Sequence, residues 1–156
     1  MSKPNIGFIG LGLMGAAMVS RLQDLGYSMS ICANISRTNI DAAVARGACE
    51  VDTARQVAAA SDIIMLCMDT TASVEARMRG PEGVISGLSA GKIVIDFGTS
   101  LPASTRALGV EVAATGAQYL DAPLGRTPAH ARDGALNIMA SGEKNAFAAA
   151  KPVLQD

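Results

Sequence analysis

A glycine pattern at the end of an apolar run is the feature of this sequence that most constrains its fold. Residues 6–9 read Ile-Gly-Phe-Ile, typical of a buried strand, and residues 10–15 read Gly-Leu-Gly-Leu-Met-Gly before a stretch with helical spacing. At such a junction Gly10 permits a tight turn, Gly12 lets an anion approach the backbone, and Gly15 lets the helix pack closely on the strand. An isolated GxGxxG would indicate only a turn, but these flanks predict a turn that binds a dinucleotide pyrophosphate at a helix N-terminus.

Short apolar runs alternate with longer stretches of helical spacing through the rest of the chain. We expect strands at residues 5–10, 28–33, 62–68 and 92–97, with further strands near 118–120 and 135–140. We expect helices at residues 13–25, 39–46, 53–60, 71–78, 102–115 and 143–154. This alternation predicts an α/β fold of the Rossmann type, a doubly wound and mainly parallel sheet between two helix layers.

Length and composition agree with one globular domain. The 156 residues are 49% hydrophobic and 17% charged, and the net charge is −1, so the sequence offers no basic patch for nucleic acid or for a membrane surface. The chain starts without an apolar signal region and has no run long enough to cross a bilayer, so we expect a cytoplasmic protein. The three cysteines show neither a disulfide framework nor metal-ligand spacing.

The end of the expected second strand is where dinucleotide-binding domains read the ribose of the adenosine. A carboxylate at this position binds the ribose hydroxyls, whereas an arginine accommodates a 2′-phosphate. This sequence has no carboxylate there but has Asn34, Ser36 and Arg37, which can hydrogen-bond a ribose or pair with a phosphate. NAD and NADP both remain candidates, with Arg37 favouring NADP; alternatively, Arg37 is only a solvated residue before the next helix.

Two separated motifs resemble one enzyme family. Residues 8–15 followed by Met18 resemble the opening signature of the β-hydroxyacid dehydrogenases, which include 3-hydroxyisobutyrate, tartronate semialdehyde and 6-phosphogluconate enzymes. Residues 120–125 and 134–139 resemble the family's substrate loop and the strand after it, usually DAPVSGG and GxLxIMxGG. The resemblance implies a nicotinamide cofactor and spans nearly the whole chain.

The resemblance also implies further cofactor contacts. In the turn, Leu11, Leu13 and Met14 are expected to contact the cofactor together with the three glycines. Residues 96–102 resemble the family segment DxSTxxP, so Thr99 is expected beside the nicotinamide, although Gly98 replaces the usual serine. Met68 and Asp69 fall where the family has a loop lining the adenosine, with Asp69 in place of proline.

The substrate loop departs from the common family form. Gly125, Arg126 and Thr127 replace SGG and resemble the GRT variant of sulfolactaldehyde reductases. The planar guanidinium of Arg126 suits a carboxylate or sulfonate, and Thr127 adds a hydroxyl, so we expect the three residues to bind a small anionic substrate. Alternatively, Arg126 ties the loop to Asp121. His130, the only histidine, is more simply a loop residue than a catalyst.

No catalytic residue is expected within residues 1–156. In the resembled family a lysine on a later helix is the acid or base, and a helical second domain closes the site; both would lie beyond Asp156. Lys151 precedes that helix and is expected to be exposed. We therefore expect a cofactor domain with little or no turnover by itself, monomeric alone and part of a homo-oligomer in a longer enzyme.

The sequence predicts the NAD(P)-binding part of an oxidoreductase. Hydride would pass between the nicotinamide and a small 3-hydroxy acid or semialdehyde that carries a carboxylate or sulfonate. A dinucleotide-binding module without catalysis and a fragment of an imine reductase remain as alternatives.

Overall fold

The computed structural model describes residues 2–33 and 37–156 and has one parallel sheet at its centre. The strands are β1 (Ile6–Ile9), β2 (Met29–Cys32), β3 (Cys49–Val51), β4 (Ile63–Leu66), β5 (Ile93–Asp96), β6 (Gln118–Asp121), β7 (Leu124–Gly125), β8 (Asn137–Ile138) and β9 (Ser141–Gly142). The main sheet has the order β3-β2-β1-β4-β5-β6-β9, in which only β9 is antiparallel. β7 and β8 pair separately as a short antiparallel ribbon.

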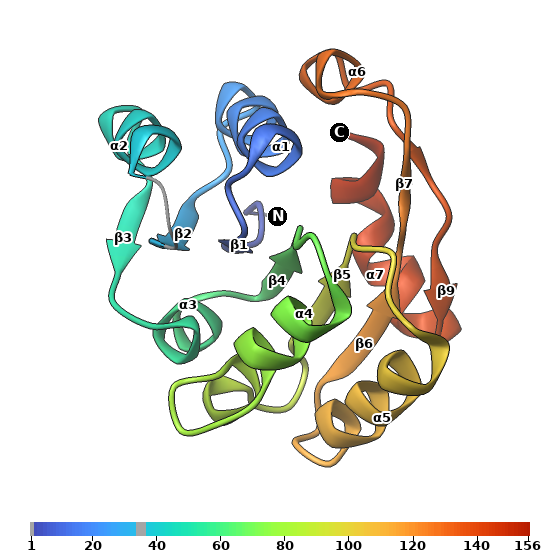
Figure 1. Cartoon of the computed structure of the whole chain (residues 1–156). Helices are drawn as coiled ribbons and strands as arrows, with labels where there is room; N and C mark the ends of the chain where they lie inside the picture. The colour runs from blue at the N-terminus through green and yellow to red at the C-terminus, as the bar shows by residue number, and fades with distance from the viewer. Residues whose placement is uncertain (1, 34–36) are drawn as a thin grey trace.

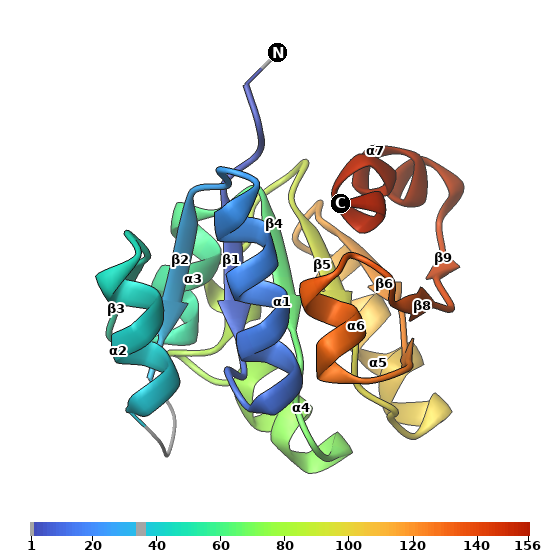
Figure 2. The same ribbon diagram turned by 90° about the horizontal axis from the view of Figure 1, so that it is seen from above.

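Helices cover both faces of this sheet. They are α1 (Leu13–Asp24), α2 (Thr38–Ala45), α3 (Ala54–Ala60), α4 (Thr71–Met78), α5 (Pro102–Ala113), α6 (Pro128–Arg132) and α7 (Lys144–Gln155), with a 3-10 turn, η1 (Val84–Gly87). Figure 1 shows α1 and α2 on one side of the strands and α3, α4 and α5 on the other. Seen from above, α6 lies beside α1 in front of the sheet (Figure 2). The expected three-layer Rossmann-type fold is confirmed.

Two apolar cores explain why β4, at the centre of the sheet, is apolar at every position. On β4, Ile63 and Met65 pack towards α1, α2, α6 and α7, while Ile64 and Leu66 pack towards α3, α4 and α5. All four side chains are buried, and full burial of one such side chain stabilises the fold by roughly 1.5–3 kcal/mol. A strand between two helix layers cannot alternate apolar and polar residues, because both of its faces are buried. The continuous apolar run of β4 agrees with this.

Helix ends follow local chemistry. The α1 helix stops where Gly26 adopts a φ of 79°, and its N–H donates to the Gln23 carbonyl. Thr53 caps α3 in a reciprocal capping box with Gln56, so the helix starts one residue after the predicted boundary.

Several short elements differ from the sequence prediction, including the two-residue β7 and the 3-10 turn η1, neither of which was predicted. β3 and α6 were not predicted, because β3 is a three-residue edge strand with exposed Cys49 and Glu50, and α6 has only five residues. The strand expected at 135–140 is divided: residues 137–138 pair with β7, and residues 141–142 form the edge of the main sheet. Pairs this short leave almost no periodic pattern in a sequence.

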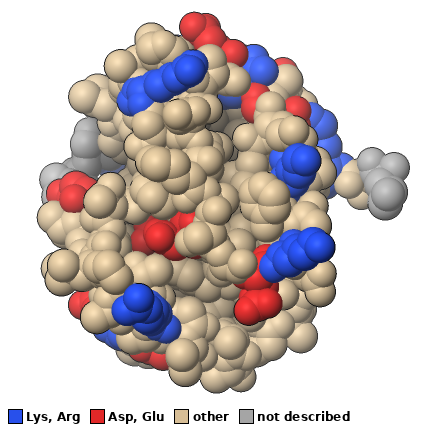
Figure 3. Space-filling model, turned by 90° about the vertical axis from the view of Figure 1, so that its right-hand side faces the viewer, with Lys and Arg blue, Asp and Glu red and all other residues tan. Residues whose placement is uncertain are grey.

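The surface carries both signs of charge. On the face drawn in Figure 3, Lys and Arg side chains lie apart, separated by uncharged surface and by acidic side chains. None of the described helices combines the length and apolar character needed to cross a bilayer.

Candidate functional site

The three glycines of the turn have different surroundings. Gly10 has a φ of 97°, and a Cβ on it would lie 2.3 Å from the Cys67 carbonyl oxygen. A Cβ on Gly15 would lie 1.9 Å from the Gly10 carbonyl oxygen, so this glycine lets α1 start against the turn. Among the described residues other than its two chain neighbours, none has an atom within 4 Å of a Cβ built on Gly12. The fold therefore gives no steric reason for Gly12, and the space beside it is open to a ligand.

The start of α1 favours an anion. Gly12 is the N-cap residue, with extended backbone, no side-chain cap and no acidic residue in the first turn. The first amides of a helix and its dipole together attract negative charge. Leu11 and Met14 pack against the core, whereas Leu13 is 83% exposed. The Leu11 carbonyl accepts a 2.8 Å hydrogen bond from the side-chain amide of Asn39, which holds the turn against α2.

A cleft of about 620 Å³ opens beside this turn. Its described lining is Gly10, Leu11, Gly12, Cys32, Ile40, Cys67, Met68, Asp69, Ser73, Ala76 and Arg77. It lies at the carboxyl ends of β1 and β4, where the strand order reverses direction, which is where ligands bind in open α/β sheets. The volume is in the range of small-molecule sites. The turn residues Gly10 to Gly12 and the loop residues Met68 and Asp69 thus line one cleft.

The cleft walls are mostly apolar or neutral. Burial raises the pKa of the Cys67 thiol to about 11 and also raises the pKa of Cys32, so both thiols are protonated at neutral pH. The exposed Asp69 accepts a 2.8 Å hydrogen bond from the Ser73 hydroxyl. This bond joins the β4–α4 loop to the first turn of α4. It anchors the loop at Asp69, the position where the family motif has a proline.

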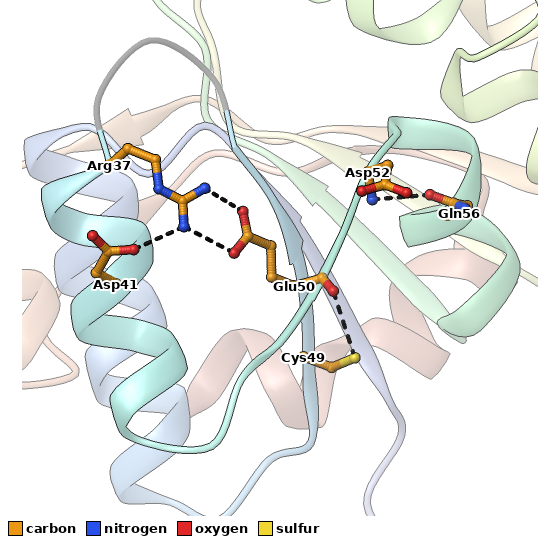
Figure 4. Close-up of polar contacts among 6 residues, drawn as sticks. All are labelled: Arg37, Asp41, Cys49, Glu50, Asp52 and Gln56. Atoms are coloured by element: carbon orange, nitrogen blue, oxygen red, sulfur yellow. Dashed lines mark hydrogen bonds and ion pairs between the residues drawn. The ribbon is translucent and has the colours of Figure 1, made fainter.

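Arg37 lies in an ion-pair cluster at the start of α2 (Figure 4). Its guanidinium binds both carboxylate oxygens of Glu50 on β3, at 2.6 and 3.0 Å, and Asp41 on α2 at 2.8 Å. These bonds hold the pKa of Arg37 above and that of Glu50 below the ordinary value. The side chain of Arg37 is 57% exposed, as the alternative of a solvated residue expected. It already has two anionic partners, Glu50 and Asp41. The predicted contacts of Asn34 and Ser36 lie outside the described residues.

Thr99 lies on the loop after β5, the next strand of the sheet. Thr99 is exposed, whereas Gly98 before it is buried. The N–H of Leu101 donates a 3.0 Å hydrogen bond to the Thr71 hydroxyl, which ties this loop to α4 beside the cleft. Thr99 does not belong to the described lining of the cleft. The preceding Gly98 lies close to the carbonyl of Met68, which is a lining residue.

The buried carboxylate of Asp96 ends β5 directly before this loop. Its surroundings raise its pKa by desolvation, and hydrogen bonds from Gly98, Tyr119 and Ser100 oppose that rise. Asp121, its neighbour on β6, also has a raised pKa because of partial burial. Sequence reasoning placed no role on Asp96 or Tyr119. For Asp96 the available signals were an acidic residue at the end of an otherwise apolar strand and its place at the start of the segment that resembles DxSTxxP.

The expected substrate loop follows β6 and spans β7 and the start of α6. Arg126 has a φ of 78°, the one positive φ among the described residues other than glycine, and such strain often marks a functional position. Its guanidinium donates to the Ala135 carbonyl at 3.0 Å, so the bond present is not the expected alternative to Asp121. Thr127 shares a 2.7 Å hydrogen bond with Nδ1 of His130. Gly125 lies on β7, and Arg126 and Thr127 are both exposed.

Comparison with known proteins connects this geometry to a family. Residues 5–156 match the model of the NAD binding domain of 6-phosphogluconate dehydrogenase. The chain belongs to this family. The resemblance to β-hydroxyacid dehydrogenases and the nicotinamide class of cofactor are thereby confirmed.

Individual relatives of the domain agree. The 2-(hydroxymethyl)glutarate dehydrogenase of Eubacterium barkeri is 37% identical over 149 residues, which cover 96% of this chain and 49% of that protein. The 2-hydroxy-3-oxopropionate reductase of Escherichia coli K12 is 35% identical over 154 residues, covering 96% and 51%. The solved structure of Psf3 in complex with NADP+ and 2-OPP is 28% identical with a TM-score of 0.90, covering 96% and 53%. The chain spans about half the length of the curated relatives it matches.

Proposed function

We propose that this domain binds a nicotinamide dinucleotide for an enzyme that interconverts a small 3-hydroxy acid and its semialdehyde. The observation that carries the proposal is the open space at Gly12, beside an uncapped helix N-terminus in a cleft at the reversal of strand order. Gly10, Leu11, Gly12, Leu13, Met14 and Gly15 would surround the pyrophosphate. Met68 and Asp69 would line the adenosine, and Thr99 would lie beside the nicotinamide.

The substrate anion would bind at the loop of Gly125, Arg126 and Thr127. A guanidinium has five N–H donors in a planar fork, and the bond from Arg126 to Ala135 uses one of them. The names of the two relatives describe a hydroxy acid and an oxo acid, which supports a substrate with a carboxylate. When bound, the nicotinamide supplies or accepts the hydride; this chain contributes orientation and electrostatics. We propose no catalytic acid or base from residues 1–156.

Within this proposal the cofactor is NADP, with Arg37 as the partner of the 2′-phosphate. The structure of Psf3 with NADP+ supports this choice. Arg37 would have to exchange at least part of its contact with Glu50 and Asp41 for the phosphate, because the cluster of one arginine and two carboxylates has a net charge of −1. These carboxylates should therefore weaken NADPH binding.

Titration of the chain with NADPH and NADH, followed by cofactor fluorescence, tests this assignment. Arg37→Ala is expected to lower the affinity for NADPH relative to NADH by roughly tenfold. Glu50→Gln is the matched control and should change the ratio in the opposite direction, because it removes a competing carboxylate. An unchanged ratio in both variants would remove Arg37 from cofactor selection, and failure of the wild type to bind either cofactor would overturn the proposed function.

A dinucleotide-binding module without catalysis remains the second candidate. It makes the same prediction for cofactor binding but differs at Arg126. If the chain serves a hydroxy acid enzyme, a small hydroxy acid should bind more tightly to the cofactor-loaded chain than to the free chain, and Arg126→Ala should abolish that difference.

A further inference from the structure

Asp96 is a fully buried carboxylate at the carboxyl end of β5. Its exposed fraction is 0%, and its strand neighbours are the apolar Leu66 on one side and Asp121 on the other. An ionised carboxylate in such a place is costly unless several hydrogen bonds compensate for the lost water. The donors that surround Asp96 therefore show what the buried charge is used to hold.

Three donors reach the two oxygens of this carboxylate. The N–H of Gly98 donates to Oδ1 at 2.8 Å, and the hydroxyls of Ser100 and Tyr119 donate to Oδ2 at 3.3 and 3.2 Å. Gly98 and Ser100 are the residues on either side of Thr99. The carboxylate thus holds the backbone of Gly98 before Thr99 and the side chain of Ser100 after it. None of the described hydrogen bonds to this carboxylate comes from Thr99 itself.

The loop held in this way borders the cofactor cleft. A Cβ on Gly98 would lie 3.1 Å from Oδ1 of Asp96 and 3.2 Å from the carbonyl oxygen of Met68, which lines the cleft. At its start the N–H of Phe97 donates to the Leu66 carbonyl at 2.8 Å, and at its end Leu101 is bonded to Thr71. The loop is therefore fixed at both ends, and Asp96 fixes its middle.

We propose that Asp96 is a positioning residue for cofactor binding: through Gly98 and Ser100 it fixes the 97–101 loop so that Thr99 meets the nicotinamide half of the dinucleotide. The inference rests on the proposed function, which places Thr99 there. Asp96 itself would not contact the cofactor, because its side chain is fully buried. Its effect should be limited to the nicotinamide half and should spare the adenosine half.

Two hydroxyls on the same carboxylate oxygen provide a matched pair of variants. Ser100→Ala removes the donor that belongs to the loop, and Tyr119→Phe removes the donor that belongs to β6. Affinities for NADPH, NADH and ADP-ribose are measured by calorimetry, since ADP-ribose has the same pyrophosphate but lacks the nicotinamide. Ser100→Ala is expected to weaken binding of the dinucleotides by about 3- to 10-fold and to leave ADP-ribose unchanged. Tyr119→Phe should leave the ratio of the affinities near that of the wild type.

A double-mutant cycle with Asp96→Asn separates positioning from direct contact. If Ser100 acts through Asp96, Ser100→Ala causes no further loss of dinucleotide affinity in the Asp96→Asn background. With Asp96 unchanged, Ser100→Thr, which keeps a hydroxyl, should bind the dinucleotides as tightly as the wild type. A loss that persists undiminished in the Asp96→Asn background would overturn the inference, as would equal losses for the dinucleotides and ADP-ribose. If the wild type bound neither ADP-ribose nor the dinucleotides, the proposed function itself would fail, which is a distinct outcome.

Discussion

At the scale of single residues, the glycine turn separates what folding needs from what a ligand needs. Gly10 and Gly15 are required by the chain itself, because a side chain at either position would overlap a backbone carbonyl. Gly12 is not, because its φ of −72° is open to any residue and no described residue beyond its chain neighbours would touch a side chain there. A substitution series at these positions should therefore affect stability and binding in different proportions.

Gly12→Ala should leave the free energy of unfolding within about 0.5 kcal/mol of the wild type and weaken dinucleotide binding by roughly tenfold or more. Gly10→Ala should lower the free energy of unfolding by about 2 kcal/mol or more, since it combines a positive φ with a backbone overlap. Urea unfolding and cofactor titration measure the two effects. Tight binding by a stable Gly12→Ala variant would show that the pyrophosphate lies elsewhere.

The pKa of Asp96 predicts a pH dependence with a definite sign. Burial raises this pKa above the unfolded value of about 3.9, so between the two values the folded state holds more protons than the unfolded state. The contribution of Asp96 to stability therefore falls as the pH rises through that window. Relative to the wild type, Asp96→Asn should gain stability as the pH rises from about 4 to 7.

Glu111→Gln is the matched control with the opposite sign. Arg79 lowers the pKa of Glu111, so this carboxylate contributes stability above its unfolded pKa and loses it as the pH falls through the folded value. Thermal midpoints across the pH range should diverge for the two variants. A common trend for both would contradict the account of Asp96.

At the scale of elements, the cleft depends on how α4 begins. The Thr70 hydroxyl accepts the N–H of Ser73 at 3.1 Å and caps α4, which contributes Ser73, Ala76 and Arg77 to the cleft. Thr53 caps α3 in the same manner, and α3 contributes no residue to the described lining. Two similar caps thus differ in that only the cap of α4 belongs to a helix that lines the cleft.

Thr70→Ala and Thr53→Ala should each lower the free energy of unfolding by about 1 kcal/mol, the usual cost of removing a cap. Only Thr70→Ala should also weaken dinucleotide binding, because fraying would move the cleft wall. Denaturant unfolding and calorimetric titration of both variants check this. Equal affinities in the two variants would show that the first turn of α4 is not part of the site.

The length of an element also decides whether it can be predicted from the sequence. The buried strands and the glycine turn were predictable, because continuous apolar runs and a GxGxxG each have one dominant physical explanation. β3 was not, although its Glu50 binds Arg37, for which the sequence left open a phosphate contact or a solvated position. Whether an exposed arginine meets a ligand or a carboxylate depends on which strand forms the sheet edge, and a three-residue strand carries too little pattern to show this.

At the scale of the whole molecule, the sheet order brings separate parts of the sequence to one edge. The turn after β1, the loop after β4 and the loop after β5 are adjacent because β1, β4 and β5 are neighbours in the parallel sheet. The family resemblance assigned all three segments to one cofactor site, and the topology explains why they are adjacent. The partners of Asp96 could not be read from the sequence, since Tyr119 reaches it from β6, 23 positions along the chain.

The central claim is that a nicotinamide dinucleotide binds across this edge, with its pyrophosphate at the turn of Gly10 to Gly15. The most direct measurement is a set of amide nitrogen–proton NMR spectra of the chain recorded during titration with NADPH and NADH. We expect saturable shifts concentrated at residues 10–15 and 67–69, with further shifts near Thr99 that ADP-ribose does not produce. Spectra that remain unchanged, or shifts that cluster away from the carboxyl ends of β1 and β4, would contradict it.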